Sequence, residues 1–277
     1  MLRYHSLIMA VRAVLFDLGD TLIFQAHQPD PAVLFPASAA RVQPLLDKWN
    51  VRLSVDLATL LAEVYRAVEI AQPVRRAREL EVDGAFITQG ALASHGIELS
   101  AGQAEALWQA SDAGLTSWGA QVYPDTLDTL ARLRAAAIPT ALVSNSWAKS
   151  GQLRASLANL GIGDDLLPII VTSADLMRPK PRPEPFERAL ALLSVSARDA
   201  VFVGDVLDAD IRGAKVLGMT TVWKLNGRHE VDPEPEADFM IHDLWELFTL
   251  DLLPAPAGAA VSQESLTPHE DDNADRY

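Results

Sequence analysis

The chain has 277 residues, an apolar fraction of 49% and a formal charge of −14 at pH 7, so it can form a sizeable core but is ill suited to bind nucleic acid or anionic membranes. It contains no cysteine, which excludes disulfides, thiolate metal sites and cysteine catalysis and favours a reducing compartment such as the cytoplasm. No apolar run approaches the roughly 18–20 residues of a membrane span, and Asp17 interrupts the first apolar run before a secretory signal would be complete.

The first half of the chain predicts one strand followed by many helices. Residues 13–16 are apolar and end at Asp17, as expected of a buried strand that delivers a carboxylate to the edge of a sheet. Apolar residues then recur at helical spacing, among them Leu57, Leu60, Leu61 and Phe86. Ser54 and Ser100 stand where helix N-caps would help. We predict a separate all-helical domain inserted at residues 25–118.

After Pro124 strands and helices alternate. The expected strands are residues 138–143, 169–171, 200–203, 220–223 and 239–241, with amphipathic helices between them, one of which runs to Gly218. This alternation predicts an α/β fold with a Rossmann-like parallel sheet and right-handed crossovers, built from residues 1–24 and 119–253. Residues 254–277 are rich in Pro and Ala and then acidic, which predicts a disordered tail.

Four polar groups follow apolar runs and are expected at one edge of this sheet. They are Asp17 with Gly19, Asp20 and Thr21; Ser144-Asn145; Lys180; and Gly204-Asp205 with Asp208 and Asp210. Taken singly, each is more often a turn, a cap or a solvated charge. Together they supply a nucleophile, a hydroxyl donor, a cation and carboxylates for a hard metal ion, which is the set that phosphoryl transfer requires.

The same residues resemble the motifs of the haloacid dehalogenase superfamily, most of whose members are Mg²⁺-dependent phosphatases. Asp17-Leu18-Gly19-Asp20-Thr21 is similar to the first motif, D-x-D-x-[T/V], and Ser144 fits the second. Lys180-Pro181-Arg182-Pro183 is close to the K-P-x-P form of the third, and Gly204 to Asp210 fits the fourth, G-D-x-x-x-x-D. The resemblance covers residues 13 to about 250, and it implies that the helical insert is a C1-type cap.

The resemblance implies a role for each matching residue. Asp17 would attack phosphorus and form an aspartyl-phosphate, which water then hydrolyses. Mg²⁺ would be held by Asp17, the backbone carbonyl of Gly19 and Asp205, while Asp210, without touching the metal, would orient Lys180 or water. Ser144 would hold phosphoryl oxygens, helped by Asn145 and Thr21, and Lys180 would offset the charge between nucleophile and phosphate. The expected substrate is a small phosphorylated metabolite.

Position 19 departs from the family pattern. Phosphatases of this superfamily usually carry a second Asp two residues after the nucleophile as the general acid, whereas this chain has Gly19 there and an Asp only at the next position, Asp20. Asp20 is therefore a tentative acid, and His27 from the insert is another candidate. Loss of a positioned acid typically costs about 10²–10⁴-fold in rate.

The sequence leaves three other functions open. A 2-haloacid dehalogenase also lacks the second Asp, but such enzymes usually lack the Gly-Asp metal motif. A phosphomutase depends on the missing acid, and a catalytically weak phospho-ligand-binding protein would keep the fold alone. Specificity is expected to lie in the insert, with Gln25, His27, Arg75, Arg76 and Arg78 as candidates, although the three arginines fit a solvated helix face better.

Overall fold

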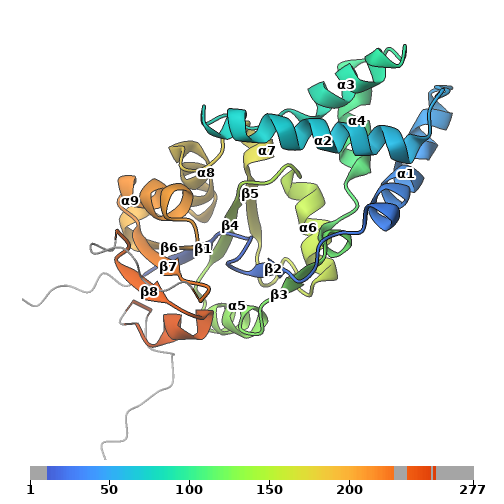
Figure 1. Cartoon of the computed structure of the whole chain (residues 1–277). Helices are drawn as coiled ribbons and strands as arrows, with labels where there is room; N and C mark the ends of the chain where they lie inside the picture. Colours follow the sequence, from blue (N-terminus) through green and yellow to red (C-terminus); the bar gives the residue numbers. More distant parts are fainter. Residues whose placement is uncertain (1–10, 228–235, 251, 254–277) are drawn as a thin grey trace, which may run out of the picture.

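The computed structural model describes residues 11–227, 236–250 and 252–253, so the predicted tail, residues 254–277, lies outside the described residues. The main strands are β1 (Ala13–Phe16), β4 (Thr140–Ser144), β5 (Ile169–Thr172), β6 (Ala200–Gly204), β7 (Thr220–Lys224) and β8 (Phe239–Ile241). They form one parallel sheet in the order β5-β4-β1-β6-β7-β8 (Figure 1). The predicted α/β class and Rossmann-like sheet are confirmed.

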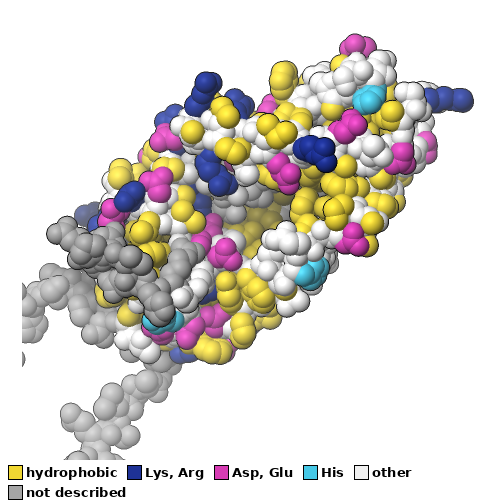
Figure 2. All heavy atoms as spheres, in the orientation of Figure 1, with side chains coloured by type: hydrophobic (Ala, Val, Ile, Leu, Met, Phe, Trp, Pro, Cys, Tyr) yellow, Lys and Arg dark blue, Asp and Glu magenta, His cyan; other side chains and the backbone are white. Residues whose placement is uncertain are grey.

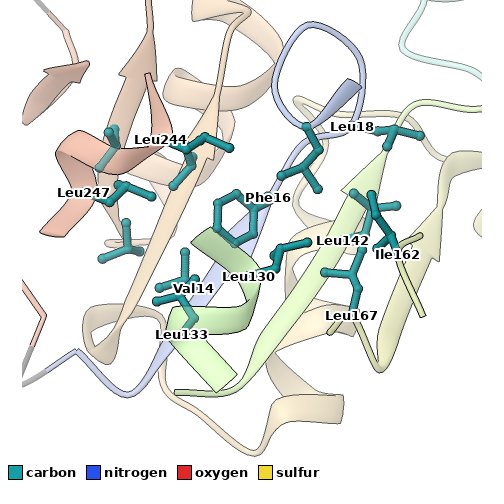
Figure 3. Packing of buried hydrophobic residues seen from close by; sticks show 14 of the residues in the cluster. Val14, Phe16, Leu18, Leu130, Leu133, Leu142, Ile162, Leu167, Leu244 and Leu247 are labelled. Carbon is teal, nitrogen blue, oxygen red and sulfur yellow. The ribbon is translucent and has the colours of Figure 1, made fainter. Parts of the chain in front are cut away.

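Both faces of the sheet are buried, because successive strand residues point to opposite sides. Val14 and Phe16 belong to the core on one face (Figure 3), while Ala13 and Leu15 belong to the core on the other. The first face is covered by α5 (Thr126–Ala135), α6 (Ser150–Asn159) and the 3₁₀ helix η4 (Leu244–Phe248). The second is covered by α8 (Pro183–Leu193) and α9 (Gly213–Val216). The result is a three-layer sandwich.

The helix predicted between Asp205 and Gly218 is divided in two. Its first part is a π-helix, η3 (Leu207–Arg212), and its second part is the short α9. The carboxylate of Asp210 accepts hydrogen bonds from the backbone N–H groups of Asp205 and Val206, at 3.2 and 3.0 Å. These hydrogen bonds hold Asp210 close to the end of β6, and the wider turn of the π-helix accommodates that position. Turns of this kind are frequent at functional sites.

Four α-helices lie within residues 25–118, where the insert is predicted, and we call them the helical insert. They are α1 (Pro31–Lys48), α2 (Leu57–Arg76), α3 (Gly84–Ser94) and α4 (Ala101–Ser111). Ser100 caps α4 as expected, in a capping box with Gln103. The expectation for Ser54 is wrong, because Asp56 caps α2 through its carboxylate instead. Within the part of the chain that the structure describes, none of the helices combines the length and apolar character needed to cross a membrane.

The helical insert has a hydrophobic core of its own. Leu46, Leu60, Leu92 and Leu107 are buried together, apart from the two cores of the sheet. Phe86, which the helical spacing places among the packed residues, is instead 71% exposed. The packed side of α3 carries Gly84, Thr88 and Leu92, all of which are buried.

A two-stranded antiparallel ribbon joins the helical insert to the rest of the chain. It consists of β2 (Ile23–Gln25) and β3 (Ala120–Val122), the latter preceded by the 3₁₀ helix η1 (Leu115–Trp118). Neither strand is predicted from the sequence, because each has only three residues and shows no alternation long enough to detect. The remaining short elements are α7 (Ser173–Leu176) and η2 (Ala197–Asp199).

Candidate active site

Three neighbouring strands bring the predicted polar groups to one edge of the sheet. β1 lies between β4 and β6, and the chain moves outward on one side of β1 before it crosses to the other. Ligands of open α/β sheets bind at such a switch point, beyond the carboxyl ends of the strands. Asp17 follows β1, Ser144 ends β4, and Gly204-Asp205 closes β6. The backbone N–H of Asp17 donates to Val203 O at 2.9 Å, which extends the ladder to the carboxylate.

Lys180 bridges two of these carboxylates from a loop. Its ammonium lies 2.6 Å from Asp17 Oδ1 and 2.6 Å from Asp210 Oδ1. All three residues are buried, with Lys180 only 3% exposed. Charge-assisted hydrogen bonds of this length are among the stronger polar contacts in proteins. The arrangement therefore fixes the orientation of Asp17.

Gly204 is required by the close approach of Asp210. A Cβ atom at position 204 would lie 2.5 Å from Cβ and 2.5 Å from Oδ2 of Asp210. Asp210 Oδ2 accepts from the backbone N–H groups of Asp205 and Val206, while Oδ1 accepts from Lys180. The Gly-Asp pair that resembles a family motif thus has a packing reason, and both oxygens of Asp210 are engaged in positioning its neighbours.

Burial and charge act against each other on the Asp17 carboxyl. Burial raises its pKa to about 7; the ammonium of Lys180 opposes the rise, and the carboxylate of Asp210 adds to it. Burial alone would disfavour the ammonium of Lys180, but Asp17 and Asp210 outweigh it and raise the pKa of Lys180 above its usual value. Lys180 is thus held as a cation, whereas burial disfavours the ionised form of the Asp17 carboxyl.

The carboxylates at this edge fit a hard divalent cation. Asp17, Asp205 and Asp210 each offer one carboxylate oxygen, and these atoms lie within 4.8 Å of one another. Three buried carboxylates against one ammonium leave an excess of negative charge that is unfavourable away from water. Oxygen ligands of this kind suit Mg²⁺. Both oxygens of Asp210 already accept hydrogen bonds, which suits the predicted role of Asp210 in orienting its neighbours without touching the metal.

Most of the predicted site residues line one cavity. Its volume is about 490 Å³, and Figure 2 shows this side of the molecule hollowed between the helical insert and the sheet domain. The residues of the four polar groups that line it are Asp17, Gly19, Asp20, Ser144, Asn145, Lys180, Asp205, Asp208 and Asp210. The geometry brings these side chains and the Gly19 backbone together, while their chemical roles stay predictions.

Thr21 does not belong to this cavity. Its side chain is fully buried, and Oγ1 finds no hydrogen-bond partner among the described residues. The backbone carbonyl of Thr21 instead accepts from the ammonium of Lys224 at 2.9 Å. This placement gives no support to the prediction that Thr21 binds substrate, because in the sharp turn after β1 its side chain is buried in the protein.

The candidate specificity residues separate into one that lines the cavity and four that do not. Arg76, at the end of α2, lines it. Arg75 donates to the carbonyl of Glu81, and Arg78 is exposed. His27 is exposed and its Nδ1 lies 3.1 Å from Gln28 O. Neither His27 nor Gln25, which donates to Trp118 O, reaches the cavity, so His27 is not placed to act as the acid.

Two further acidic groups line this cavity, Glu79 and Asp208. Asp208 belongs to the fourth polar group singled out in the sequence, whereas no sequence pattern predicts Glu79. Glu79 comes from the helical insert and pairs with Arg182, with 3.5 Å between Oε2 and Nε. Asp208 comes from η3 and pairs with Arg212 at 3.3 Å. No spacing in the sequence marks Glu79, because the contact depends on how α2 ends against the loop of Lys180.

Comparison with known proteins identifies the family. The model of the haloacid dehalogenase-like hydrolases matches residues 11–218, most of the chain. The chain belongs to this family. It is therefore a hydrolase, and the resemblance seen in the four motifs is confirmed; the assignment of the helical insert to the C1 type of the family stays a prediction.

Individual relatives of the family include both phosphatases and dehalogenases. A phosphoserine phosphatase of Thermus thermophilus is 30% identical over 48% of this chain and 52% of its own length, so the chain spans only about half of that relative. A glyceraldehyde 3-phosphate phosphatase of Pyrococcus furiosus is 26% identical over 86% of this chain and 91% of its own. The structure of a 2-haloacid dehalogenase from Pseudomonas syringae, 25% identical, matches 86% of this chain and 97% of its own with a TM-score of 0.54.

Proposed function

We propose that this hydrolase is a Mg²⁺-dependent phosphatase that cleaves a small phosphorylated metabolite through an aspartyl-phosphate on Asp17. The observation that carries the proposal is the contact of the Lys180 ammonium with both Asp17 and Asp210, beside Asp205, in one buried cluster. A carboxylate nucleophile beside a cation and beside carboxylates that can bind a divalent metal ion suits phosphoryl transfer. The phosphoserine and glyceraldehyde 3-phosphate phosphatases among the relatives support this substrate class.

In the proposed mechanism, one oxygen of Asp17 attacks phosphorus while the bond to the leaving oxygen breaks. Lys180 holds Asp17 in orientation and offsets negative charge as it approaches the phosphoryl group. Ser144, which lines the cavity, donates its hydroxyl to a phosphoryl oxygen. Water then attacks phosphorus, the bond to Asp17 breaks, and the free carboxylate returns. When bound by Asp17, Asp205 and the carbonyl of Gly19, Mg²⁺ would supply positive charge to the phosphoryl oxygens.

Protonation of the leaving oxygen is proposed for Asp20. The residue lines the cavity in a left-handed backbone conformation, with φ of 56°. Its backbone carbonyl accepts hydrogen bonds from Lys224 and Asn226, which hold the turn in place. No other residue between Asp17 and Thr21 carries an acidic group.

The helical insert is proposed to serve as the cap, with boundaries at residues 25 and 118. These boundaries adjoin the ribbon of β2 and β3, the two points at which the chain enters and leaves the insert. Arg76 and Glu79 extend from the insert into the cavity that holds Asp17. A cap that contributes such groups would exclude water and select the leaving group.

One experiment separates the phosphatase from a dehalogenase. The wild-type protein is assayed for phosphate release from p-nitrophenyl phosphate with Mg²⁺ and with a chelator, and for halide release from 2-chloropropionate. The proposal predicts phosphate release that the chelator abolishes and no halide release. Metal-independent halide release without phosphatase activity would identify a dehalogenase, and inactivity in both assays would contradict the proposed phosphatase.

A further inference from the structure

A second cavity adjoins the catalytic one between the helical insert and the sheet domain. Its volume is about 260 Å³, whereas an apolar cavity of about 150 Å³ is enough to hold benzene. We call it the aromatic chamber, because six of its lining residues are large and aromatic or aliphatic: Tyr65, Trp108, Trp118, Trp147, Leu115 and Leu153.

The aromatic wall of the chamber is fixed by packing. The ring of Tyr65 lies 5.5 Å from the ring of Trp108 and 5.5 Å from that of Trp118, measured between centroids. Its hydroxyl donates to the carbonyl of Ser111 at 3.1 Å, so its polar end is satisfied away from the chamber. Tilted ring pairs at such distances stabilise one another beyond simple burial. The wall is therefore preformed.

Asn145 connects the aromatic chamber to the catalytic cavity, since it lines both. Its amide makes two hydrogen bonds to the backbone of Lys180, at 2.7 and 3.0 Å, which keeps the residue at the boundary. A phosphate ester that places its phosphoryl group at Asp17 can extend past Asn145 into the chamber. The group that enters the chamber is then part of the leaving alcohol.

The charges of the two cavities differ. The catalytic cavity is lined by six carboxylates and by two cations, Lys180 and Arg76, that can offset an anion, whereas the aromatic chamber has no Lys, Arg or His among its lining residues in the described part of the chain. Among the described residues that line it, Asp112 carries the single charged side chain. A carboxylate or second phosphate in the chamber would lose its hydration and meet a like charge, which is costly.

We propose that the leaving alcohol of the substrate carries a bulky apolar group and no second anion, and that the aromatic chamber binds this group. The inference rests on the proposed phosphatase function and adds the chemical class of the substrate. It predicts that a phenylalkyl phosphate is preferred to a short alkyl phosphate, and that carboxylated or bisphosphorylated metabolites are poor substrates.

The test measures competitive inhibition, so that it does not depend on the leaving group. Mg²⁺-dependent hydrolysis of acetyl phosphate, whose leaving group is too small to fill the chamber, is inhibited by ethylphosphonate, 2-phenylethylphosphonate or phosphonoacetate. We expect 2-phenylethylphosphonate to inhibit at about a tenfold lower concentration than ethylphosphonate, in line with the value of added apolar groups in such pockets. Phosphonoacetate should be weaker than ethylphosphonate.

Substitutions in the aromatic chamber test whether the phenyl group of the inhibitor binds there. Trp147→Ala removes part of the chamber wall, whereas Ala148→Phe places a large side chain in the chamber. Both substitutions should abolish the stronger inhibition by 2-phenylethylphosphonate relative to ethylphosphonate. Trp245→Ala is the matched control, because Trp245 lies outside both cavities and should keep that advantage. Equal inhibition by the three phosphonates, or a phenyl advantage that survives in both chamber variants, would overturn this inference alone. Absence of acetyl phosphate hydrolysis would overturn the proposed function as well.

Discussion

The side chain of Asn145 is bound to the backbone of Lys180 at both ends of its amide. Asn145 Oδ1 accepts from the N–H of Lys180 at 2.7 Å, and Nδ2 donates to the carbonyl of Lys180 at 3.0 Å. Asn145 follows β4, while Lys180 lies in the loop before α8. The residue that the sequence marked as a substrate ligand therefore also positions the cation that contacts Asp17.

Asn145→Ala should weaken both the fold and catalysis. The substitution leaves the N–H and carbonyl of Lys180 without their partners, which should lower the free energy of unfolding by about 1–3 kcal/mol. It should also lower kcat, because Lys180 is no longer held against Asp17. Urea denaturation and steady-state kinetics measure the two effects. Asn159→Ala, at the exposed end of α6, is the control, and a variant at position 145 that matches it in both assays would refute the positioning role.

Metal dependence should follow Asp205. Asp205→Asn removes an anionic ligand from a hard cation, so the Mg²⁺ concentration at half-maximal activity should rise by at least about tenfold. Asp208→Asn is the matched control, because Asp208 lines the same cavity but is not one of the three clustered carboxylates. If the Mg²⁺ concentration at half-maximal activity changed equally in the two variants, the metal would bind elsewhere.

Asp20→Asn should remove the general acid, and Gly19→Asp should replace it. Because acid catalysis matters most for poor leaving groups, Asp20→Asn should lower kcat/KM for alkyl phosphates within the range of about 10²–10⁴-fold, with little change for acetyl phosphate. A Cβ atom at position 19 meets nothing within 4 Å, so Gly19→Asp fits the turn, and adding it to the Asp20→Asn protein should recover part of the lost rate. A plot of kcat/KM against leaving-group pKa that has the same slope in all three proteins would dismiss both residues.

The stability of the protein at alkaline pH should depend on Lys224. Burial lowers the pKa of its ammonium to about 8, against 10.5 for the ordinary group. Between these pH values the unfolded chain binds more protons than the folded chain at this residue, so its contribution to the free energy of unfolding rises with pH. Wild type should therefore gain stability relative to Lys224→Met between pH 8 and 10.5. Urea midpoints measured for both proteins at several pH values test this, and a constant difference would show that Lys224 does not titrate in that range.

Much of the sheet can be predicted from the sequence, because strands buried on both faces are short apolar runs with polar ends. Residues 13–16 are predicted and found as β1, and the runs before Ser144 and Gly204 end where the site begins. Three of the four motifs lie at strand ends, and parallel pairing brings these ends to one edge; Lys180 reaches the same edge from the loop before α8.

Other parts depend on tertiary contacts that no local pattern encodes. The side chain of Thr21 sits in a turn whose backbone Lys224 holds from a distant strand, so its direction is not visible in the motif. Glu79 and Arg76 reach the cavity because of how the helical insert packs on the sheet domain. The aromatic chamber likewise combines residues from α2, α4, η1 and α6, which are far apart in the sequence.

Replacement of the nucleophile gives the simplest loss of function. Asp17→Asn keeps the shape of the side chain and a hydrogen-bond acceptor for Lys180, but an amide does not attack phosphorus. Phosphate release should fall to the background rate while the circular dichroism spectrum stays that of the wild type. Activity close to wild type in a folded Asn variant would assign the nucleophile to another residue.

Direct detection of phosphorus on Asp17 tests the account most closely. Wild-type protein with Mg²⁺ and acetyl phosphate is quenched in acid during turnover, digested and examined by mass spectrometry. We predict that the peptide containing Asp17 carries a phosphoryl group that hydroxylamine removes, and that the Asp17→Asn protein carries none. Release of phosphate by a wild-type protein that never carries a phosphoryl group on Asp17 would contradict the proposed mechanism.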